Sequence, residues 1–358
     1  MILTFKVKHQ IDFSEPLKQA KQVAKFAIAN RNKLSSKYVA HIGLKSVISN
    51  QILRKYGMNR KCKTISRVKL IVPNQGIRFD KITKTIEISS LKLKFQYQFK
   101  QLFSKINQIE IDKEYFYVSV EVEEEKQYKV EGWVGVDRNT TGPCAVAACT
   151  KTNKVMFLGK QAHHIHKKYS RIRKKLQRLG KLKKLNTIKR RESNITKDIN
   201  HKISKKIVKY AKDNKCGIKL EKLKGIRQTT KQAKSFKYSL NSWAYYQLQT
   251  FVEYKALLAG VPVAYIEPAY TSQRCHKCGL LGKRNDKSFK CPFCGYTSHA
   301  DVNAAWNIAY SEKLLEEPRA EHCSKSASLP SGNVYIQRLA QEGDCVKGNT
   351  DIPQLDLS

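Results

Sequence analysis

Acidic residues are scarce in this chain of 358 residues, which holds 29 Asp and Glu against 69 Lys and Arg. The formal net charge of +40 makes a compact fold repel itself unless it meets a polyanion. Nucleic acid is the expected polyanion, because neutralising its phosphates releases counterions. A basic ribosomal or chromatin protein is the plainer alternative. A Lys-rich surface that is merely solvated ordinarily carries matching acids, and these are missing here.

Long apolar runs and internal repeats are absent as well. No stretch of 18 or more apolar residues occurs, so no membrane span is predicted. The apolar run at the start of the chain, MILTFKV, is too short for a signal peptide. Both absences predict a cytosolic protein. In such a reducing compartment, closely spaced cysteines indicate a metal site rather than disulfides.

The chain is long enough for two or three domains, and 41% hydrophobic residues suffice for folded cores. In residues 1–12 and 61–130, apolar and polar residues alternate and predict strands, which we interpret as a small β-barrel. Residues 13–60 are predicted to be helical and to interrupt the barrel after its first strand. Ser14 as N-cap and Pro16 in the first turn mark the start of these helices.

Residues 131–270 and 299–310 alternate short apolar strands with helices, which predicts an α/β core. Within it, residues 161–210 hold 18 Lys and Arg against 2 acidic residues. Apolar residues recur there at every third or fourth position, which predicts two helices, interrupted at Gly180, each with one buried stripe. Their outer faces are predicted to contact nucleic-acid phosphates, although a solvated Lys-rich helix is the alternative. The residues predicted to make these contacts are Lys167, Lys168, Arg171, Arg173, Lys174, Lys175, Arg178, Lys181, Lys183 and Lys184. Residues 311–358 show no sustained periodicity and are predicted to form a flexible tail.

Four cysteines in residues 271–298 have the spacing of a zinc ribbon, Cys275-x2-Cys278-x12-Cys291-x2-Cys294. Two cysteines separated by two residues place two thiolates on one tight turn, and a second such turn completes a tetrahedron. Gly279 and Gly295 follow the two pairs and suit these turns. Four thiolates leave no open coordination position, so the zinc is predicted to be structural rather than catalytic. His276 and His299 are not expected to be ligands.

Three acidic residues stand at the ends of predicted elements of the α/β core. Asp137 and Glu221 each end an apolar strand, and Asp301 begins a helix after the cysteine-rich segment. Taken singly, Asp137 could cap a turn and Asp301 could be an ordinary N-cap. Together, in so basic a chain, they predict a site for phosphodiester hydrolysis, since clustered carboxylates can hold two hard divalent cations. Oxygen ligands favour Mg²⁺ or Mn²⁺, with one cation activating water and the other stabilising the leaving oxygen.

Four segments resemble the TnpB (OrfB) proteins of insertion sequences, which are relatives of the type V CRISPR effectors. The segments are GVDRNT from Gly135, LEKLK from Leu220, TSQRCHKCG from Thr271 and DVNAAWNI from Asp301. The resemblance is specific over roughly residues 130–310, and before that it covers only the general layout. One departure is that Arg138-Asn139 follows the first Asp, where many relatives have Leu-Gly.

The resemblance implies that the α/β core is an RNase H-like (RuvC) nuclease domain into which the zinc ribbon is inserted. The N-terminal β-barrel would be a wedge domain, and its helical insert would be a recognition segment. By the same resemblance, Asp137, Glu221 and Asp301 are the catalytic acids and the ligands of two Mg²⁺ or Mn²⁺ ions. The four cysteines would hold one structural Zn²⁺.

An activity and a set of partners also follow from the resemblance. The family cuts double-stranded DNA under the direction of a guide RNA from the element's own locus, at a target beside a short recognised motif. The chain would then be a cytoplasmic, nucleoid-associated prokaryotic endonuclease with neither a membrane partner nor a small-molecule substrate. Two alternatives stay open. One is a nuclease-inactive RNA-guided DNA-binding regulator, and the other is a DNA transposase, because RNase H-like cores also serve strand transfer.

Overall fold

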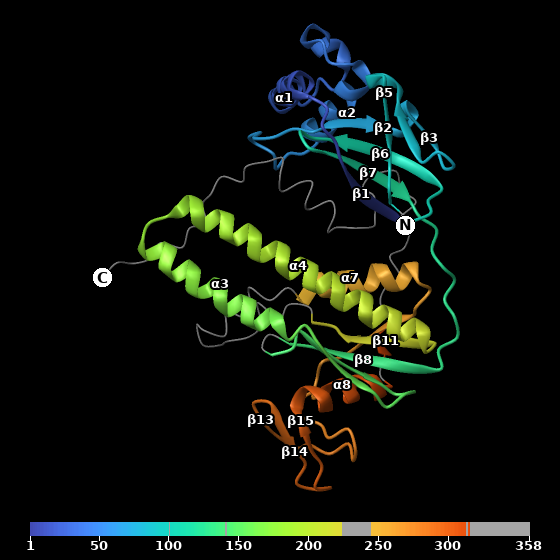
Figure 1. Cartoon of the computed structure of the whole chain (residues 1–358), viewed down its shortest axis with the longest axis vertical. Helices are drawn as coiled ribbons and strands as arrows, with labels where there is room; N and C mark the ends of the chain where they lie inside the picture. The colour runs from blue at the N-terminus through green and yellow to red at the C-terminus, as the bar shows by residue number, and fades with distance from the viewer. Residues whose placement is uncertain (100, 140–141, 224–244, 313, 316–358) are drawn as a thin grey trace. The chain divides into compact units, whose positions relative to one another are not determined.

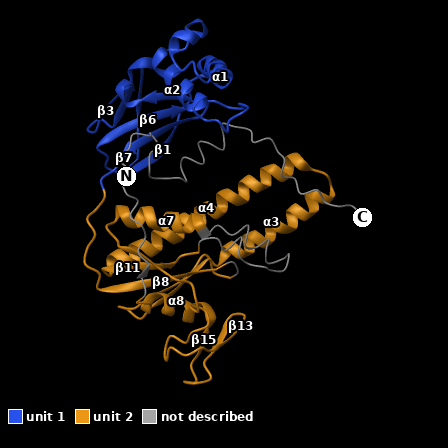
Figure 2. Cartoon of the chain, turned by 180° about the vertical axis from the view of Figure 1, so that it is seen from behind, with its two compact units in different colours: residues 1–123, 325–358 blue, residues 124–324 orange. Residues whose placement is uncertain are grey.

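The computed structural model describes the chain outside residues 100, 140–141, 224–244, 313 and 316–358 (Figure 1). The described residues belong to two compact units, Met1–Glu123 and Glu124–Ser324 (Figure 2). The predicted tail lies outside the described residues, except for positions 311, 312, 314 and 315. Among the described helices, none is both long and apolar enough to cross a bilayer.

The unit Met1–Glu123 contains two antiparallel sheets and two α-helices. The larger sheet has the strand order β1-β7-β6-β2, and the smaller one has the order β3-β4-β5. Over the residues that the structure describes, no ladder joins the two sheets into one closed ring, so the wedge barrel stays a prediction. Helices α1 and α2 lie between β1 and β2 in the chain, where the helical insert was predicted. The elements are β1 (Ile2–Lys8), α1 (Ser14–Ala29), η1 (Ser36–Ile42), α2 (Ser46–Gly57), β2 (Leu70–Pro73), η2 (Asn74–Gly76), β3 (Ile77–Asp80), β4 (Thr85–Ile88), η3 (Ser89–Leu91), β5 (Leu93–Gln96), β6 (Lys105–Ile111) and β7 (Tyr115–Glu121).

The first helix begins one residue earlier than predicted. Ser14 is the first residue of α1 and Phe13 holds the N-cap position, so the prediction of Ser14 as N-cap is wrong. Asp12 supplies the acceptor instead, since its Oδ1 accepts hydrogen bonds from the backbone N (2.9 Å) and the Oγ (2.5 Å) of Ser14. Pro16 lies in the first turn as predicted, where a missing N–H loses no helical hydrogen bond.

The unit Glu124–Ser324 is built around a mixed six-stranded sheet of order β10-β9-β8-β11-β12-β16. Its strands β8, β11 and β12 run parallel, and β9, β10 and β16 run antiparallel to their neighbours. A separate small sheet, β13-β14-β15, lies in the cysteine-rich segment. The elements are β8 (Gly132–Arg138), β9 (Ala145–Cys149), β10 (Val155–Leu158), α3 (Gln161–Arg178), α4 (Leu182–Asp213), β11 (Cys216–Glu221), α7 (Tyr245–Leu258), β12 (Val263–Ile266), β13 (Lys283–Asn285), β14 (Ser288–Lys290), β15 (Thr297–His299), α8 (Ala300–Tyr310) and β16 (Leu314–Leu315).

Different helices cover the two faces of the six-stranded sheet. Figure 1 shows α4 and α7 on one side of β8 and β11, and α8 on the other. The residues of β8 and β11 that pack against α4 and α7 are Val134, Val136, Ile218 and Leu220. Because side chains alternate along a strand, the odd-numbered residues of β8 and β11 face α8. Asp137 and Glu221 are among these odd-numbered residues.

Gly135 lies where α8 crosses β8. A methyl group on Gly135 would come within 2.3 Å of both the backbone oxygen of Ala305 and the backbone nitrogen of Ala309. Glycine is therefore required for this close approach of helix and strand. On the same face, Lys219 Nζ donates to the backbone oxygens of Ala309 (3.0 Å) and Ser311 (2.7 Å). A cation at the last carbonyls of a helix stabilises its C-terminal end, so Lys219 fixes α8 to β11.

Replacing Gly135 by Ala should destabilise this unit and displace α8, because the clashing atoms are backbone atoms. A loss of roughly 1–3 kcal/mol is expected for overpacking, which calorimetry would register as a lowered melting temperature. Gly76→Ala is the matched control, because a methyl group there would lie 3.6 Å from the nearest atom, a side-chain carbon of Val72. Equal melting temperatures for the two variants would contradict the close contact at Gly135.

Helices α3 and α4 lie side by side as a basic hairpin (Figures 1 and 2). Gly180, with φ +60°, stands between them at the predicted interruption. Ile203 and Ile207 of α4 are buried, as their spacing indicated. No residue of α3 is fully buried. The hairpin therefore packs through α4, and α3 lies at the surface.

Candidate metal centres

Asp137 and Glu221 end neighbouring parallel strands. The ladder between β8 and β11 pairs Val136 with Leu220, so one further step in the same register places Asp137 beside Glu221. Both side chains face α8, and the two residues are only 9% and 8% exposed. Open α/β sheets bind their ligands at the carboxyl ends of parallel strands. Here that edge of the sheet carries two buried acids.

Asp301 comes from α8. It lies in the first turn, and the N-cap is His299, whose Nδ1 accepts a hydrogen bond from the backbone N of Asp301 at 3.3 Å. The alternative interpretation of Asp301 as an ordinary N-cap is therefore wrong. Its carboxylate is fully buried and accepts from Arg284 Nη2 at 3.3 Å and from Lys287 Nζ at 2.8 Å. Arg284 belongs to β13, and Lys287 lies in the turn before β14.

Burial raises the pKa values of both Asp137 and Glu221. The pKa of Asp137 is raised to about 8, first by burial and then by the charges of Glu221 and Asp301. Burial also raises the pKa of Glu221, against the opposing effects of Thr271 and Arg138. Acids that resist joint ionisation bind cations well, because a divalent cation restores the charge balance and fills the oxygen coordination. A donor set made only of carboxylate oxygens fits Mg²⁺ or Mn²⁺.

The three acids do not yet form one ligand sphere. Over the part of the chain that the structure describes, the four cysteines are the one group of three or more His, Cys, Asp or Glu whose ligand atoms lie close enough to share an ion. The physical reason is found at Asp301, since Arg284 and Lys287 each hold one of its two carboxylate oxygens. A cation that binds Asp301 must therefore compete with two ion pairs.

Two polar side chains orient the acids, and the sequence analysis missed both. Asn139 Nδ2 donates to Asp137 Oδ2 at 3.1 Å, and Thr271 Oγ1 donates to Glu221 Oε1. Both residues belong to segments that carry the TnpB resemblance, so the resemblance could have indicated that they lie near the acids. The amide of Asn139 is the donor that this segment supplies to Asp137.

The four cysteines gather at one point. Their sulfur atoms all lie within 4.8 Å of one another, with 3.7 Å between Sγ of Cys275 and Cys294 and 3.5 Å between Sγ of Cys278 and Cys291. Thiolates bound tetrahedrally to zinc at about 2.3 Å lie roughly 3.8 Å apart, so the cluster fits Zn²⁺. The residues after each pair, Gly279 and Gly295, have φ of +77° and +70°, which the knuckle turns require.

The cysteine cluster is fastened to α8 by two asparagines. Asn303 Nδ2 and Asn307 Nδ2 both donate to the backbone oxygen of Arg274, at 2.7 Å and 2.6 Å. Asn303 Oδ1 also accepts from the backbone N of His276 at 3.1 Å. These contacts were not predicted, although both asparagines lie in the segment that begins at Asp301. They hold the cysteine-rich segment against the helix that carries the third acid.

Nine of the ten basic residues predicted to contact nucleic acid are exposed, and Arg173 is the exception. Arg173 and His166 of α3 both pair with Glu192 of α4, and the side chains of Arg173 and Glu192 are only 19% and 14% exposed. Arg173 therefore joins the two helices of the hairpin. The exposed residues are Lys167, Lys168, Arg171, Lys174, Lys175, Arg178, Lys181, Lys183 and Lys184.

Comparisons with known proteins find relatives for parts of the chain. Residues 245–308 match a family model described as Cas12f1-like, TNB domain. The chain is 38% identical over 143 residues to the CRISPR-associated endodeoxyribonuclease Cas12f1 of Sulfoacidibacillus thermotolerans, an alignment that covers 38% of this chain and 32% of that protein. It is 36% identical over 152 residues to the TnpB-like protein MJ0751 of Methanocaldococcus jannaschii, covering 40% of this chain and 55% of that protein. The predicted resemblance to the TnpB/OrfB family is confirmed.

A TnpB-type relative aligns over more of the chain. The putative RNA-guided DNA endonuclease InsQ of Escherichia coli K12 is 28% identical over 263 residues, which covers 65% of this chain and 63% of that protein. A solved structure described as the cryo-EM structure of the Cas12f1-sgRNA-target DNA complex has a TM-score of 0.54 and 17% identity, over 85% of this chain and 82% of that chain. This likeness shows that the two chains share a fold. The chain spans about a third of the length of the Cas12f1 nuclease.

Replacing Asp137 by Asn should stabilise the metal-free protein above neutral pH. The pKa of Asp137 is about 8 in the fold against an ordinary value of 3.8, so the fold favours the protonated form. The corresponding stability is complete below about pH 4 and is lost as the pH rises through about 8. In a chelator, the melting temperature of the wild type should therefore fall over this range relative to Asp137→Asn.

Scanning fluorimetry across pH, with and without Mg²⁺, checks this expectation. Added Mg²⁺ should raise the melting temperature of the wild type and not of the Asn variant, since a ligand stabilises only the fold that binds it. The control is Asp213→Asn at the exposed end of α4, which should follow the wild type throughout. Parallel pH profiles for the wild type and Asp137→Asn would show that the carboxyl is not the group responsible.

Replacing Cys278 by Ser should remove zinc from the cysteine cluster, because three thiolates bind the ion far less tightly than four. The control is Cys144→Ser, which alters a half-buried thiol outside the cluster. Metal analysis of the purified proteins should find one zinc per chain in the control and substantially less in Cys278→Ser. Stoichiometric zinc in Cys278→Ser would rule out the four-thiolate site.

Proposed function

We propose that the chain is an RNA-guided DNA endonuclease of a transposable element, which hydrolyses phosphodiester bonds with two divalent cations. The observation that supports this most strongly is the placement of Asp137, Glu221 and Asp301 at the carboxyl edge of the β8–β11 pair. Asp137 and Glu221 are buried acids with raised pKa values, so a bound cation would stabilise their ionised forms. In a chain of net charge +40, whose exposed surface attracts polyanions, such a cation site suits the cleavage of nucleic acid.

The residues around the acids suggest how the site would act. Mg²⁺ or Mn²⁺ held by the three carboxylates would supply an activated water and stabilise the leaving oxygen. Asn139 and Thr271 fix the orientation of Asp137 and Glu221 through their hydrogen bonds. Asp137 must lose its proton to serve as a ligand, so its raised pKa makes cation binding stronger as the pH rises toward about 8.

The cysteine cluster would hold one structural Zn²⁺ and support the same site. Arg284 and Lys287 lie in the segment between the two cysteine pairs, and both contact Asp301. A zinc ion that fixes the ends of this segment therefore also positions the two cations at the carboxylate. In this proposal the zinc does no chemistry, because four thiolates leave no open position.

The proposed partners are a guide RNA from the element's own locus and a double-stranded DNA target beside a short recognised motif. Curated relatives are named endodeoxyribonuclease and RNA-guided DNA endonuclease. The nine exposed Lys and Arg residues of the α3–α4 hairpin offer positive charge without matching acidic residues, which suits the phosphates of either nucleic acid. We also propose a wedge domain in residues 1–12 and 61–130, with a recognition insert in residues 13–60.

One observation favours the alternative of a nuclease-inactive regulator that binds DNA through its RNA. Asp301 is held by two cationic side chains, so its charge is already balanced without a metal ion. A site kept in that state would bind nucleic acid and leave it intact. The two functions predict different outcomes in the same assay.

The deciding experiment is cleavage of a DNA library by the chain co-expressed with RNA from its own locus. We expect cleavage that needs Mg²⁺ and a guide-matched target, and that stops with Asp137→Ala. The matched control is Asp213→Ala, which should cut like the wild type because this exposed acid precedes the amino end of β11, whereas Glu221 ends that strand. RNA binding without any cleavage by the wild type would overturn the nuclease proposal and support the regulator.

A further inference from the structure

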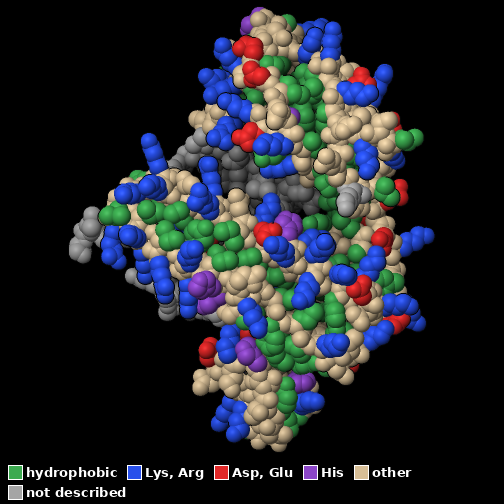
Figure 3. Space-filling view, viewed as in Figure 1, with side chains coloured by type: hydrophobic (Ala, Val, Ile, Leu, Met, Phe, Trp, Pro, Cys, Tyr) green, Lys and Arg blue, Asp and Glu red, His purple; other side chains and the backbone are tan. Residues whose placement is uncertain are grey.

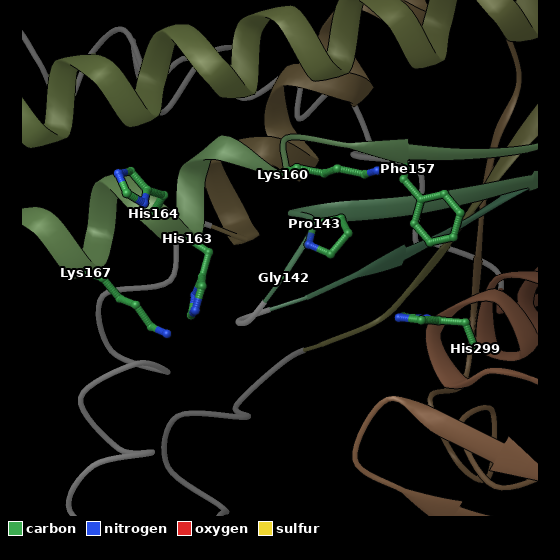
Figure 4. Close-up of a pocket in the computed structure, with 8 residues that line it drawn as sticks. All are labelled: Gly142, Pro143, Phe157, Lys160, His163, His164, Lys167 and His299. Carbon is green, nitrogen blue, oxygen red and sulfur yellow. The ribbon is translucent and has the colours of Figure 1, made fainter.

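A hollow of about 490 Å³ lies beside the carboxylates, within the size range of small-ligand sites. Basic and aromatic side chains line it, and the charged residues in its wall are all basic (Figure 4). The alternative is that the hollow binds no ligand and is filled by solvent. The side chains that carry the argument are Pro143, Phe157, Lys160, His163, Lys167 and His299.

The hollow is assembled from three parts of the same unit. Phe157 lies on β10, and Lys160, His163 and Lys167 lie at the beginning of α3. His163 and Lys167 are four residues apart and share one face of the helix, and Figure 4 shows both side chains extending from α3 toward the same side. His299 comes from the segment just before α8. The hollow therefore joins the basic hairpin to the helix that carries Asp301.

Two contacts place the hollow next to the candidate site. His299 Nδ1 accepts from the backbone N of Asp301 at 3.3 Å. Gly142 also lines the hollow, and a methyl group on it would lie 3.9 Å from Cε of Lys287, whose Nζ is 2.8 Å from Asp301 Oδ2. A molecule bound in the hollow would thus lie within one side chain's reach of Asp301.

The chemistry of the lining suits a nucleotide. The ring of Phe157 meets the ring of His299 edge to face, with 5.7 Å between centroids, and Phe157 is 40% exposed. Lys160 Nζ lies 5.5 Å from the centroid of the same ring. Exposed aromatic faces stack with bases of any sequence, and neighbouring lysines attract the phosphates. Aromatic and cationic groups interleaved in this way are typical of sites for single-stranded nucleic acid.

We propose that this hollow binds one nucleotide of the DNA strand that is being cut, with its base on Phe157 and its phosphate beside Lys160, His163 and Lys167. The proposal rests on the proposed function and names a contact of its substrate. A nucleotide held there sets the adjoining phosphate of the strand toward Asp301. These side chains would bind the strand without touching the reacting atoms, so losing them should weaken substrate binding and leave the chemical step nearly unchanged.

The first test measures binding alone, so it does not depend on cleavage. The probe is a short single-stranded oligodeoxynucleotide that carries 5-iododeoxyuridine, mixed with full-length Asp137→Asn protein. Illumination should cross-link the probe to the peptide that contains Phe157, as mass spectrometry would show. Phe157→Leu and the double variant Lys160→Ala/Lys167→Ala should each weaken binding about tenfold, within the range for losing one stacked base.

Control variants test whether any exposed aromatic residue or any exposed lysine has the same effect. Phe293→Leu alters an exposed aromatic residue in the cysteine-rich segment, and Lys154→Ala alters an exposed lysine before β10. Neither residue lines the hollow, so both variants should bind like the parent protein. Cross-links confined to other peptides, or equal affinities for Phe157→Leu and Phe293→Leu, would overturn the proposal.

A second test uses wild-type protein with its guide RNA and a matched DNA target. Phe157→Leu should raise KM about tenfold and leave kcat nearly unchanged, the pattern for a lost binding contact. Unchanged KM in a protein that still cuts would overturn the proposed subsite and leave the nuclease intact. Cross-linking at Phe157 in a protein that never cuts would instead overturn the proposed function and retain the nucleotide site.

Discussion

The close contact between α8 and β8 at Gly135 is the constraint on which the candidate site depends. Strand pairing alone brings Asp137 beside Glu221, because β8 and β11 share one parallel register. The third acid lies 80 residues beyond Glu221 on a helix, and register cannot position it. Asp301 approaches the strand ends because α8 crosses β8 where the strand has no side chain, and Lys219 fixes the far end of that helix.

The cysteine cluster extends the same arrangement beyond the sheet. Asn303 and Asn307 tie the cysteine-rich segment to α8, while Arg284 and Lys287 of that segment contact Asp301. Without a metal ion in the cluster, the cysteine-rich segment would lose its local fold. Arg284 and Lys287 would then no longer be held against the carboxylate of Asp301. A zinc ion held by this cluster would in this sense shape the electrostatic environment of the acids, although it would hold no reacting group.

Several parts of this arrangement could be predicted from the sequence because their signals are local. Apolar runs that end in Asp137 and Glu221 indicate strand ends, and two CxxC pairs at a short spacing indicate a zinc cluster. The contacts of Arg284 and Lys287 could not be found in this way, since each is one of 69 Lys and Arg and nothing local distinguishes it. Arg173 was misjudged for the same reason, because its partner Glu192 lies on the next helix. The predicted N-cap of α1 was wrong by one residue, because Asp12 provides the hydrogen-bond acceptor that was expected of Ser14.

The charges around Asp301 connect metal binding with the arrival of a substrate. Burial opposes ionisation at Asp137 and Glu221, and Asp301 shares its charge with Arg284 and Lys287. A phosphate that enters beside these two cations offers them a second anionic partner and weakens their hold on the carboxylate. In the proposed nuclease, divalent cations would then compete for Asp301 against weaker ion pairs, so binding of the strand and binding of the metal would favour each other reciprocally. A nuclease built in this way would bind its catalytic metals most tightly when a nucleic-acid strand is in place.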